Sequence, residues 1–310
     1  MPGSVSNGTN PGDCMSTKSI PYNPVIFKSV VLLIVVVPLL ATALAIKMLW
    51  QHAVHWPDLA LLGILYILTT VGICVGYHRM LSHRSFRANP VVKFVLLVLG
   101  SVALQGNSLE WAATHIKHHA LADREGDPHS PLEGFFHAHV GWLFGVGLND
   151  SDPNVYCPHL LKDPLVTFVG RTYWLWAALG LGIPFLLAGW EGLLWGGLVR
   201  MALQHHITWS VNSVCHVFGK REFATNDQSH NEWIVGLLAF GEGWHNNHHA
   251  FPRSAFHGLH WWQFDLSGYI IWTLERLGLV HDVYRVPLAS LERRSSAKVG
   301  AVAAKPKEGQ

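Results

Sequence analysis

The sequence has few charged residues and almost no net charge. Only 14% of its 310 residues are Asp, Glu, Lys or Arg, and 22 basic against 20 acidic side chains leave a formal charge of +2. Nucleic-acid-binding proteins carry clustered basic surfaces, so this balance excludes a nucleic-acid partner. Hydrophobic residues make up 50% of the chain and the mean hydropathy is +0.23, which excludes a disordered protein.

Cysteine is scarce as well. The chain has four cysteines, which lie far apart and form no CxxC pair. This spacing excludes a disulfide framework and a metal site built from thiolates. The four are Cys14, Cys74, Cys157 and Cys215.

Long apolar runs, by contrast, are abundant. Four of them are long enough to cross a bilayer, and they predict transmembrane helices at about 29–50, 59–77, 173–190 and 192–215. The fourth is interrupted by Arg200, His205 and His206, and we expect the two histidines to form a polar patch facing the bundle interior. A shorter run, 94–109, is predicted not to span. The first run begins too late to be a signal peptide.

Basic residues are distributed unevenly between the connecting segments. Residues 51–58 contain no Lys or Arg, whereas residues 78–171 contain eight and the segment from Lys220 onward contains ten. By the positive-inside rule, both termini and the long segment face the cytoplasm. We therefore predict one domain at 26–288, with a cytoplasmic cap made from 78–171 and 216–288. The polar tails, 1–25 and 289–310, are predicted to be disordered.

Histidine is the unusual residue, with 21 copies beside 14 tryptophans. Tryptophans near the span ends are typical of interfacial anchors. Ionisable groups near lipid are costly, which indicates that the histidines have a function. Eight of them form an HxxxxH motif and two HxxHH motifs on the cytoplasmic side: His78 and His83, then His115, His118 and His119, then His245, His248 and His249.

The spacing of these motifs suits metal binding. In a helix, HxxHH places its imidazoles at about 0°, 300° and 40°, on one face. Imidazole suits iron, zinc and copper, and eight nitrogens are too many for one ion, so two metals are predicted. His216 lies one turn after Asn212 and can face the same cavity. Glu110 and Glu242 are candidates to orient the ring N–H groups.

The ordered motifs HRMLSH, HIKHH, NSVCH and GEGWHNNHHAFP resemble those of the membrane-bound fatty acyl desaturases, in particular the Δ9, stearoyl-CoA-desaturase-like branch. The stretches GDPHSP and HVGWLF are similar to that branch as well. The resemblance covers about residues 60–286.

This resemblance implies an all-α membrane protein with four transmembrane helices under a cytoplasmic helical cap that holds a di-iron site. It implies insertion of a cis double bond into a saturated acyl chain, with O2, two electrons and two non-heme irons that are ferrous at rest. One iron would take His78, His83, His115, His119 and His248. The other would take His118, His216, His245 and His249, with Asn212 reaching it through a water. Asp127, in GDPHSP, joins Glu110 and Glu242 as a partner of the ligands.

The resemblance also indicates a substrate tunnel. It implies that Gln105, Trp111 and Thr208 lie at a bend in the tunnel. Tyr66 and Thr70 are one turn apart on the second predicted span, and they are candidates to close the far end and limit chain length. The alternative for this pair is ordinary helix packing.

Two departures affect the expected partners. Animal members carry an Arg-Asp pair before the second histidine motif, where this chain has Ala113 and Thr114, so the substrate can be an acyl-CoA or an acyl group on a membrane lipid. No HPGG heme motif occurs, so electrons would come from a separate ferredoxin, rubredoxin or cytochrome b5 with an NAD(P)H reductase. The compact chain is more typical of a bacterial member, which places it in a bacterial inner membrane.

Two other functions remain open at this point. A di-iron alkane or acyl hydroxylase would use the same oxidant but release an alcohol. A non-catalytic membrane protein that binds metal or heme is the alternative from another class. A transporter would place its ligands at mid-membrane, whereas these motifs lie at span ends.

Overall fold

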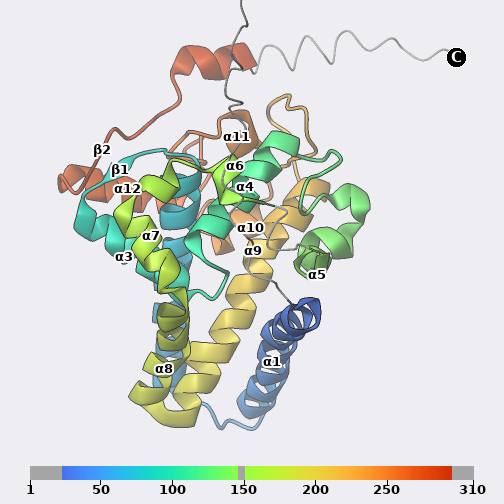
Figure 1. Cartoon of the computed structure of the whole chain (residues 1–310), viewed down its shortest axis with the longest axis vertical. Helices are drawn as coiled ribbons and strands as arrows, with labels where there is room; N and C mark the ends of the chain where they lie inside the picture. Colours follow the sequence, from blue (N-terminus) through green and yellow to red (C-terminus); the bar gives the residue numbers. More distant parts are fainter. Residues whose placement is uncertain (1–22, 146–150, 295–310) are drawn as a thin grey trace, which may run out of the picture.

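The computed structural model describes residues 23–145 and 151–294, and this part of the chain is mostly helical (Figure 1). A small antiparallel sheet pairs β1 (Arg87–Ala88) with β2 (Val280–His281). The helices are α1 (Pro24–Trp50), α2 (Trp56–Val71), η1 (Gly72–Ser82), α3 (Pro90–Val102), α4 (Ser108–Leu121), η2 (Pro131–Glu133), η3 (His137–Gly141), α5 (Trp142–Gly145), α6 (Pro153–Tyr156), η4 (Leu160–Lys162), α7 (Pro164–Arg171), α8 (Tyr173–Gly192), η5 (Leu193–Val199), α9 (Arg200–Val217), α10 (Trp233–Leu238), α11 (His245–Ala250) and α12 (Leu266–Arg276).

Three helical segments are long and apolar enough to cross a membrane: Pro24–Trp50, Trp56–Ser82 and Tyr173–Val217. The first two match the first two predicted runs, and the third contains the other two runs. This third segment is broken at Ala188 and at Gly189, whose φ of 60° suits a residue without a Cβ. The chain folds back at this break, so that α8 packs against η5 (Figure 1).

Helix α3 is too short to span, as predicted, and buried side chains bind the carbonyls near its end. Arg200 donates to Val102 O at 3.4 Å, and His205 Nε2 lies 3.0 Å from Ala103 O. The last carbonyls of any helix lack partners within that helix, so these two residues of α9 serve as a cap for α3. Arg200 also donates to Gly180 O of α8 at 3.2 Å. Of the two histidines expected in the interior, His205 is buried here, whereas His206 is half-buried and its Nδ1 lies 3.0 Å from His139 Nε2.

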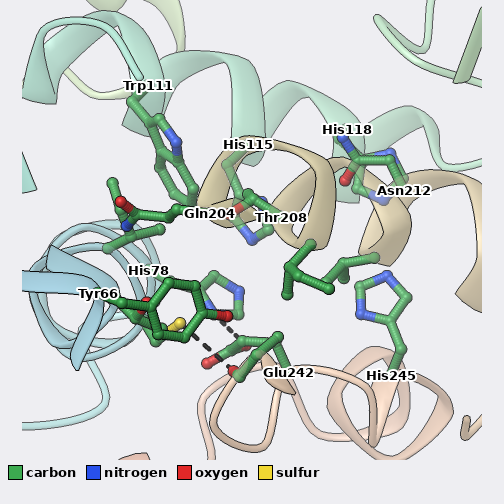
Figure 2. Close-up of a pocket in the computed structure, with 16 residues that line it drawn as sticks. Tyr66, His78, Trp111, His115, His118, Gln204, Thr208, Asn212, Glu242 and His245 are labelled. Carbon is green, nitrogen blue, oxygen red and sulfur yellow. Dashed lines mark hydrogen bonds and ion pairs between the residues drawn. The ribbon is translucent and has the colours of Figure 1, made fainter. Parts of the chain in front are cut away.

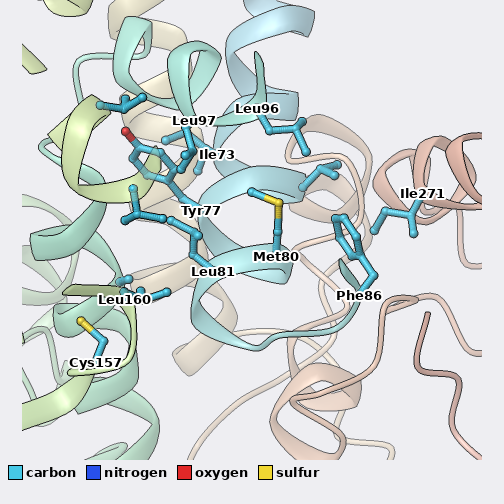
Figure 3. Close-up of a cluster of buried hydrophobic side chains, with 14 of the residues drawn as sticks. Ile73, Tyr77, Met80, Leu81, Phe86, Leu96, Leu97, Cys157, Leu160 and Ile271 are labelled. Carbon is cyan, nitrogen blue, oxygen red and sulfur yellow. The ribbon is translucent and has the colours of Figure 1, made fainter. Parts of the chain in front are cut away.

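The main apolar core lies where η1 packs against α3 (Figure 3). The approach is so close that a Cβ added at Gly72 would lie 2.2 Å from the backbone nitrogen of Gly100. The segment η1 has π-helical geometry, which is frequent at functional sites. The core residues include Ile73, Tyr77, Met80, Leu81, Phe86, Leu96, Leu97 and Ile271. This packing fixes the position of His78, which η1 carries.

The predicted tail boundaries differ slightly from the observed helices. Helix α1 begins at Pro24, inside the predicted N-terminal tail. Residues 288–294 are helical, although the C-terminal tail was expected to begin at 289. The rest of both predicted tails lies outside the described residues. The short helices of the chain gather at one end of the long ones (Figure 1).

Candidate metal centre and substrate pocket

Four segments bring the nine predicted histidines together. They are the end of α2–η1, helix α4, the end of α9 and helix α11. Within each of two groups, one ligand atom from every member lies within 4.8 Å of the others. The five-histidine group is His78, His83, His115, His119 and His248, and the four-histidine group is His118, His216, His245 and His249.

In the five-histidine group, the Nε2 atoms point toward one another. His83 Nε2 lies 2.7 Å from His115 Nε2, and His248 Nε2 lies 2.9 Å from His119 Nε2 and 3.1 Å from His78 Nε2. These imidazoles come from three separate segments. Such convergence of nitrogen lone pairs is the arrangement that a transition metal ion requires.

The Nε2 atoms of the four-histidine group are also close together and buried. His216 Nε2 lies 3.0 Å from His245 Nε2. The Nε2 atoms of His118 and His249 are buried and have no hydrogen-bond partner among the described residues. Buried polar atoms are rarely left without a partner, so these nitrogens fit a bound metal ion.

Carboxylates face the opposite nitrogen of four of these rings. His118 Nδ1 lies 2.9 Å from Asp127, and His216 Nδ1 and His249 Nδ1 each lie 3.0 Å from a carboxylate, on Asp123 and Asp227 respectively. His78 Nδ1 lies 2.6 Å from Glu242. A carboxylate that accepts the Nδ1 proton leaves the lone pair on Nε2, where a metal can use it.

Two of these four carboxylates, Asp127 and Glu242, were predicted from the sequence, and the structure brings both beside histidine rings. Asp123 and Asp227 were missed, because neither has a fixed spacing from the histidine that it contacts. Glu110 was expected here too, but its side chain is exposed, and no hydrogen bond or ion pair joins it to these histidines within 23–145 and 151–294. Glu110 precedes His115 by five residues, so the two side chains lie about 140° apart around the axis of α4.

Burial favours the neutral form of five of these imidazoles. Desolvation, aided by neighbouring rings, lowers the pKa of His249 to about 4 and holds the pKa of four others well below the usual range: His115, His119, His245 and His248. Burial alone would raise the carboxylate pKa values, but the histidine N–H donors lower the pKa of Asp123, Asp127, Asp227 and Glu242. Neutral imidazoles are the form that binds metal.

A buried ion-pair network holds Glu242 in place. The fully buried Arg79 donates from Nε to Glu242 at 3.2 Å and from its two terminal nitrogens to both oxygens of Asp265, at 3.0 and 2.9 Å. His257 Nδ1 also lies 3.1 Å from Glu242. Because Arg79 follows His78 directly, this network fixes the backbone that carries one ligand candidate.

One pocket adjoins both histidine groups (Figure 2). Four of the five predicted tunnel residues line it: Tyr66, Thr70, Trp111 and Thr208. Asn212 lines it too, as do His78, His115, His118, His245 and Glu242. Gln105 does not line the pocket, but its Nε2 donates to Thr208 Oγ1 at 2.9 Å and holds that side chain.

Tyr66 reaches across to the segment that leads to Glu242. Its hydroxyl donates to Leu238 O at 2.8 Å, and its ring meets the edge of Phe240 with the centroids 6.0 Å apart. Tyr66 therefore joins α2 to α10 at the lining of the pocket. Fold and site together define a helical protein with candidate membrane spans and two histidine clusters able to hold metal ions beside one pocket.

Comparison with known proteins agrees with this class. The model of the fatty acid desaturase family matches residues 54–274. The chain is 41% identical over 277 residues to a hex-5-enoyl-[acyl-carrier protein] acetylenase of Moorena producens strain JHB, covering 83% of this chain and 85% of that protein. It is 41% identical over 242 residues to Delta-9 acyl-lipid desaturase 1 of Arabidopsis thaliana, covering 77% and 79%. It is 39% identical over 230 residues to an sn-1 stearoyl-lipid 9-desaturase of Anabaena variabilis, covering 74% and 84%.

The chain belongs to the fatty acid desaturase family. It is an oxidoreductase that desaturates fatty acyl groups, as its motifs predicted.

Proposed function

We propose that this enzyme inserts a cis double bond at Δ9 into a saturated long-chain acyl group, using O2 and two electrons. The observation that carries the proposal is the pocket in which apolar side chains and both histidine groups meet. The Δ9 position is supported by the relatives named for it.

We further propose that two iron ions occupy the two histidine groups. The five-histidine group would hold one ion and the four-histidine group the other, with Asn212 reaching the second through a water. The partnerless Nε2 atoms of His118 and His249 support this assignment. Imidazole-rich sites suit iron.

The substrate explains why a metal is needed. A mid-chain methylene has no acidic proton, leaving group or polar handle, so acid–base and nucleophilic catalysis cannot act on it. The balanced reaction takes –CH2–CH2–, O2, two electrons and two protons to –CH=CH– and two waters. When bound, the irons would supply the oxidising power that removes the two hydrogens.

The protein residues would choose which two carbons react. Adjacent methylenes are chemically alike, and apolar contacts discriminate weakly between them. Geometry must therefore select the carbon. Trp111 and Thr208, the latter held by Gln105, lie on opposite helices of the pocket and would fix its course past the histidines. Tyr66 and Thr70 would limit the length of chain that fits.

The proposed setting is a bacterial inner membrane. The break at Gly189 supports two crossings by the third apolar segment, and four crossings would put both termini and the histidine groups on the cytoplasmic side. A separate ferredoxin, rubredoxin or cytochrome b5 with an NAD(P)H reductase would deliver the electrons. The acyl group would be carried by a membrane lipid or by CoA.

Expression in a desaturase-deficient host tests the proposal. New monounsaturated fatty acids with a cis bond at C9 are the expected product. A hydroxylated product would favour a hydroxylase, and an alkyne would favour the chemistry named for the acetylenase relative. Metal analysis should find about two irons per chain without a heme absorption band; a single heme iron would contradict the assignment.

A further inference from the structure

The substrate pocket contains a polar side chain that the proposed function leaves without a role. Gln204 of α9 is 1% exposed, and its Nε2 atom has no hydrogen-bond partner among the described residues. It lines the pocket together with Thr208 and Asn212. These two residues follow Gln204 by four and eight positions, so all three side chains lie on one face of α9, within about 80° of one another.

A buried arginine fixes the orientation of the Gln204 amide. Arg200 Nη1 donates to Gln204 Oε1 at 3.3 Å. Because a guanidinium group can only donate, the amide atom that faces it must be the oxygen. Arg200 is itself fully buried and donates to the carbonyls of Gly196, Val102 and Gly180. The NH2 group of Gln204 is therefore turned away from Arg200 and stays unpaired beside the pocket.

Gln204 lies at the end of the pocket that is remote from the histidine groups. It precedes His216 by 12 residues, about 18 Å along α9. On the facing helix, Tyr66 precedes His78 by 12 residues. Helices α2 and α9 pack against each other and both run toward the histidines, so Gln204 and Tyr66 lie at the same end (Figure 2). An acyl chain whose reacting carbons lie beside the histidines would bring its methyl end toward this NH2 group.

An apolar chain cannot accept a hydrogen bond from this NH2 group. A buried donor without an acceptor typically lowers an equilibrium constant by a factor of about 5 to 150. Where a chain stops short of Gln204, water can fill the remaining space and accept the bond. The pocket has a cavity volume of about 50 Å³, and one water molecule needs roughly 10–15 Å³. A longer chain displaces that water and leaves the donor unpaired.

We propose that Gln204 is a specificity-determining residue, which limits the length of the acyl chain by its polarity. Chains whose terminal methylenes reach the NH2 group are disfavoured relative to chains that leave this end of the pocket hydrated. The inference rests on the proposed function in that the pocket takes a saturated acyl chain. Gln204 differs in this from Tyr66, whose ring would limit the chain by its bulk.

Two substitutions of nearly equal size separate polarity from bulk. Gln204→Met removes the NH2 group and should raise the ratio of longer to shorter products about 5- to 150-fold. Gln204→Glu places a carboxylate at the same point, and because a carboxylate is costlier to dehydrate than an amide, this variant should lower the ratio. Arg200 keeps its three backbone acceptors in both variants, so the fold should tolerate them.

The matched control is Gln228→Met. Gln228 also accepts a hydrogen bond from an arginine, at 3.4 Å from Arg221 Nη1, but its side chain is exposed and lies outside the pocket. The measurement is the chain length of the unsaturated products in a desaturase-deficient host that is supplied with myristic, palmitic, stearic and arachidic acids together. The profile of Gln228→Met should equal that of the wild type.

Two results would overturn the proposal. One is an unchanged length profile in both Gln204 variants. The other is a shift of both variants in the same direction, which would show that packing and not polarity sets the limit. The readout does not depend on where the double bond falls, so a product without a bond at C9 would count against the proposed function alone. If the wild-type protein forms no product, displacement of a fluorescent fatty acid from the purified protein by the same four acids gives the comparison without iron or electrons.

Discussion

Asp227→Asn should weaken metal binding although Asp227 is not itself expected to be a ligand. One carboxylate oxygen faces His249 Nδ1 at 3.0 Å, and the other accepts from the Ser229 backbone at 3.0 Å and the Thr225 hydroxyl at 2.8 Å. An asparagine that keeps the second set of bonds turns its NH2 group toward His249. Facing a donor, Nδ1 must act as an acceptor, and the ring proton moves to Nε2.

A proton on Nε2 removes the lone pair that a metal would use. Loss of such a carboxylate partner typically costs about 10- to 100-fold in metal affinity, equivalent to about 1.4–2.8 kcal/mol. His249→Ala, which deletes the ring, should cost more than Asp227→Asn. The His249 Nε2 atom has no hydrogen-bond partner among the described residues that could compensate.

The assay is an iron titration of the apoprotein, followed by metal analysis after dialysis. The control is Asp282→Asn, because Asp282 is mostly exposed and pairs with Arg87 at the surface at 3.5 Å. Wild type and Asp282→Asn should retain iron equally, and Asp227→Asn should release part of it. Iron affinity of Asp227→Asn equal to that of both would refute the reasoning.

Three further results are expected. Arg79→Met leaves the buried carboxylates of Glu242 and Asp265 without their positively charged partner. It should lower the free energy of unfolding by about 3–5 kcal/mol, and an unchanged melting temperature would contradict this role of the ion-pair network. The apoprotein should lose stability as the pH falls from about 6.5 to about 4. The pKa of native His249 is lowered to about 4, so in this range the unfolded state binds a proton at this residue and the native state does not. His249 alone should lower the free energy of unfolding by about 3 kcal/mol, and a stability that does not change with pH would exclude the effect. Tyr66→Ala should extend the pocket and shift products to longer chains, whereas Tyr269→Ala, outside the pocket on α12, should leave the product profile unchanged.

Helical periodicity in the sequence was enough to predict which histidines lie on the same face of a helix. An HxxHH motif on a helix fixes which rings share a face, so α4 and α11 brought their six histidines to the site. Asp123 and Asp227 could not be found this way, because loops bring them to the site and loop geometry has no period. Glu110 does not reach these histidines because its position lies about 140° around α4 from His115.

Hydropathy and the positions of the tryptophans predicted part of the arrangement in the membrane. Hydropathy located the long helices and divided the last apolar segment at about residue 191, but it could not show that the backbone breaks at Ala188 and Gly189. Tryptophan was interpreted mainly as an anchor. Trp50 and Trp190 are indeed exposed near span ends, whereas Trp195 and Trp244 are buried. Composition gives the number of tryptophans, and tertiary packing decides which of them face lipid.

The sharing of helices between the two histidine groups couples them energetically. Helix α4 gives His115 and His119 to the five-histidine group and His118 to the four-histidine group, whereas α11 gives His248 to the first and His245 and His249 to the second. Ordering either helix around one ion also orders ligands for the second, so the entropy cost of the second binding step is already partly met. Metal loading should therefore be cooperative, with the singly occupied protein a minor species. The two sites should gain and lose their ions together because both depend on the positions of α4 and α11.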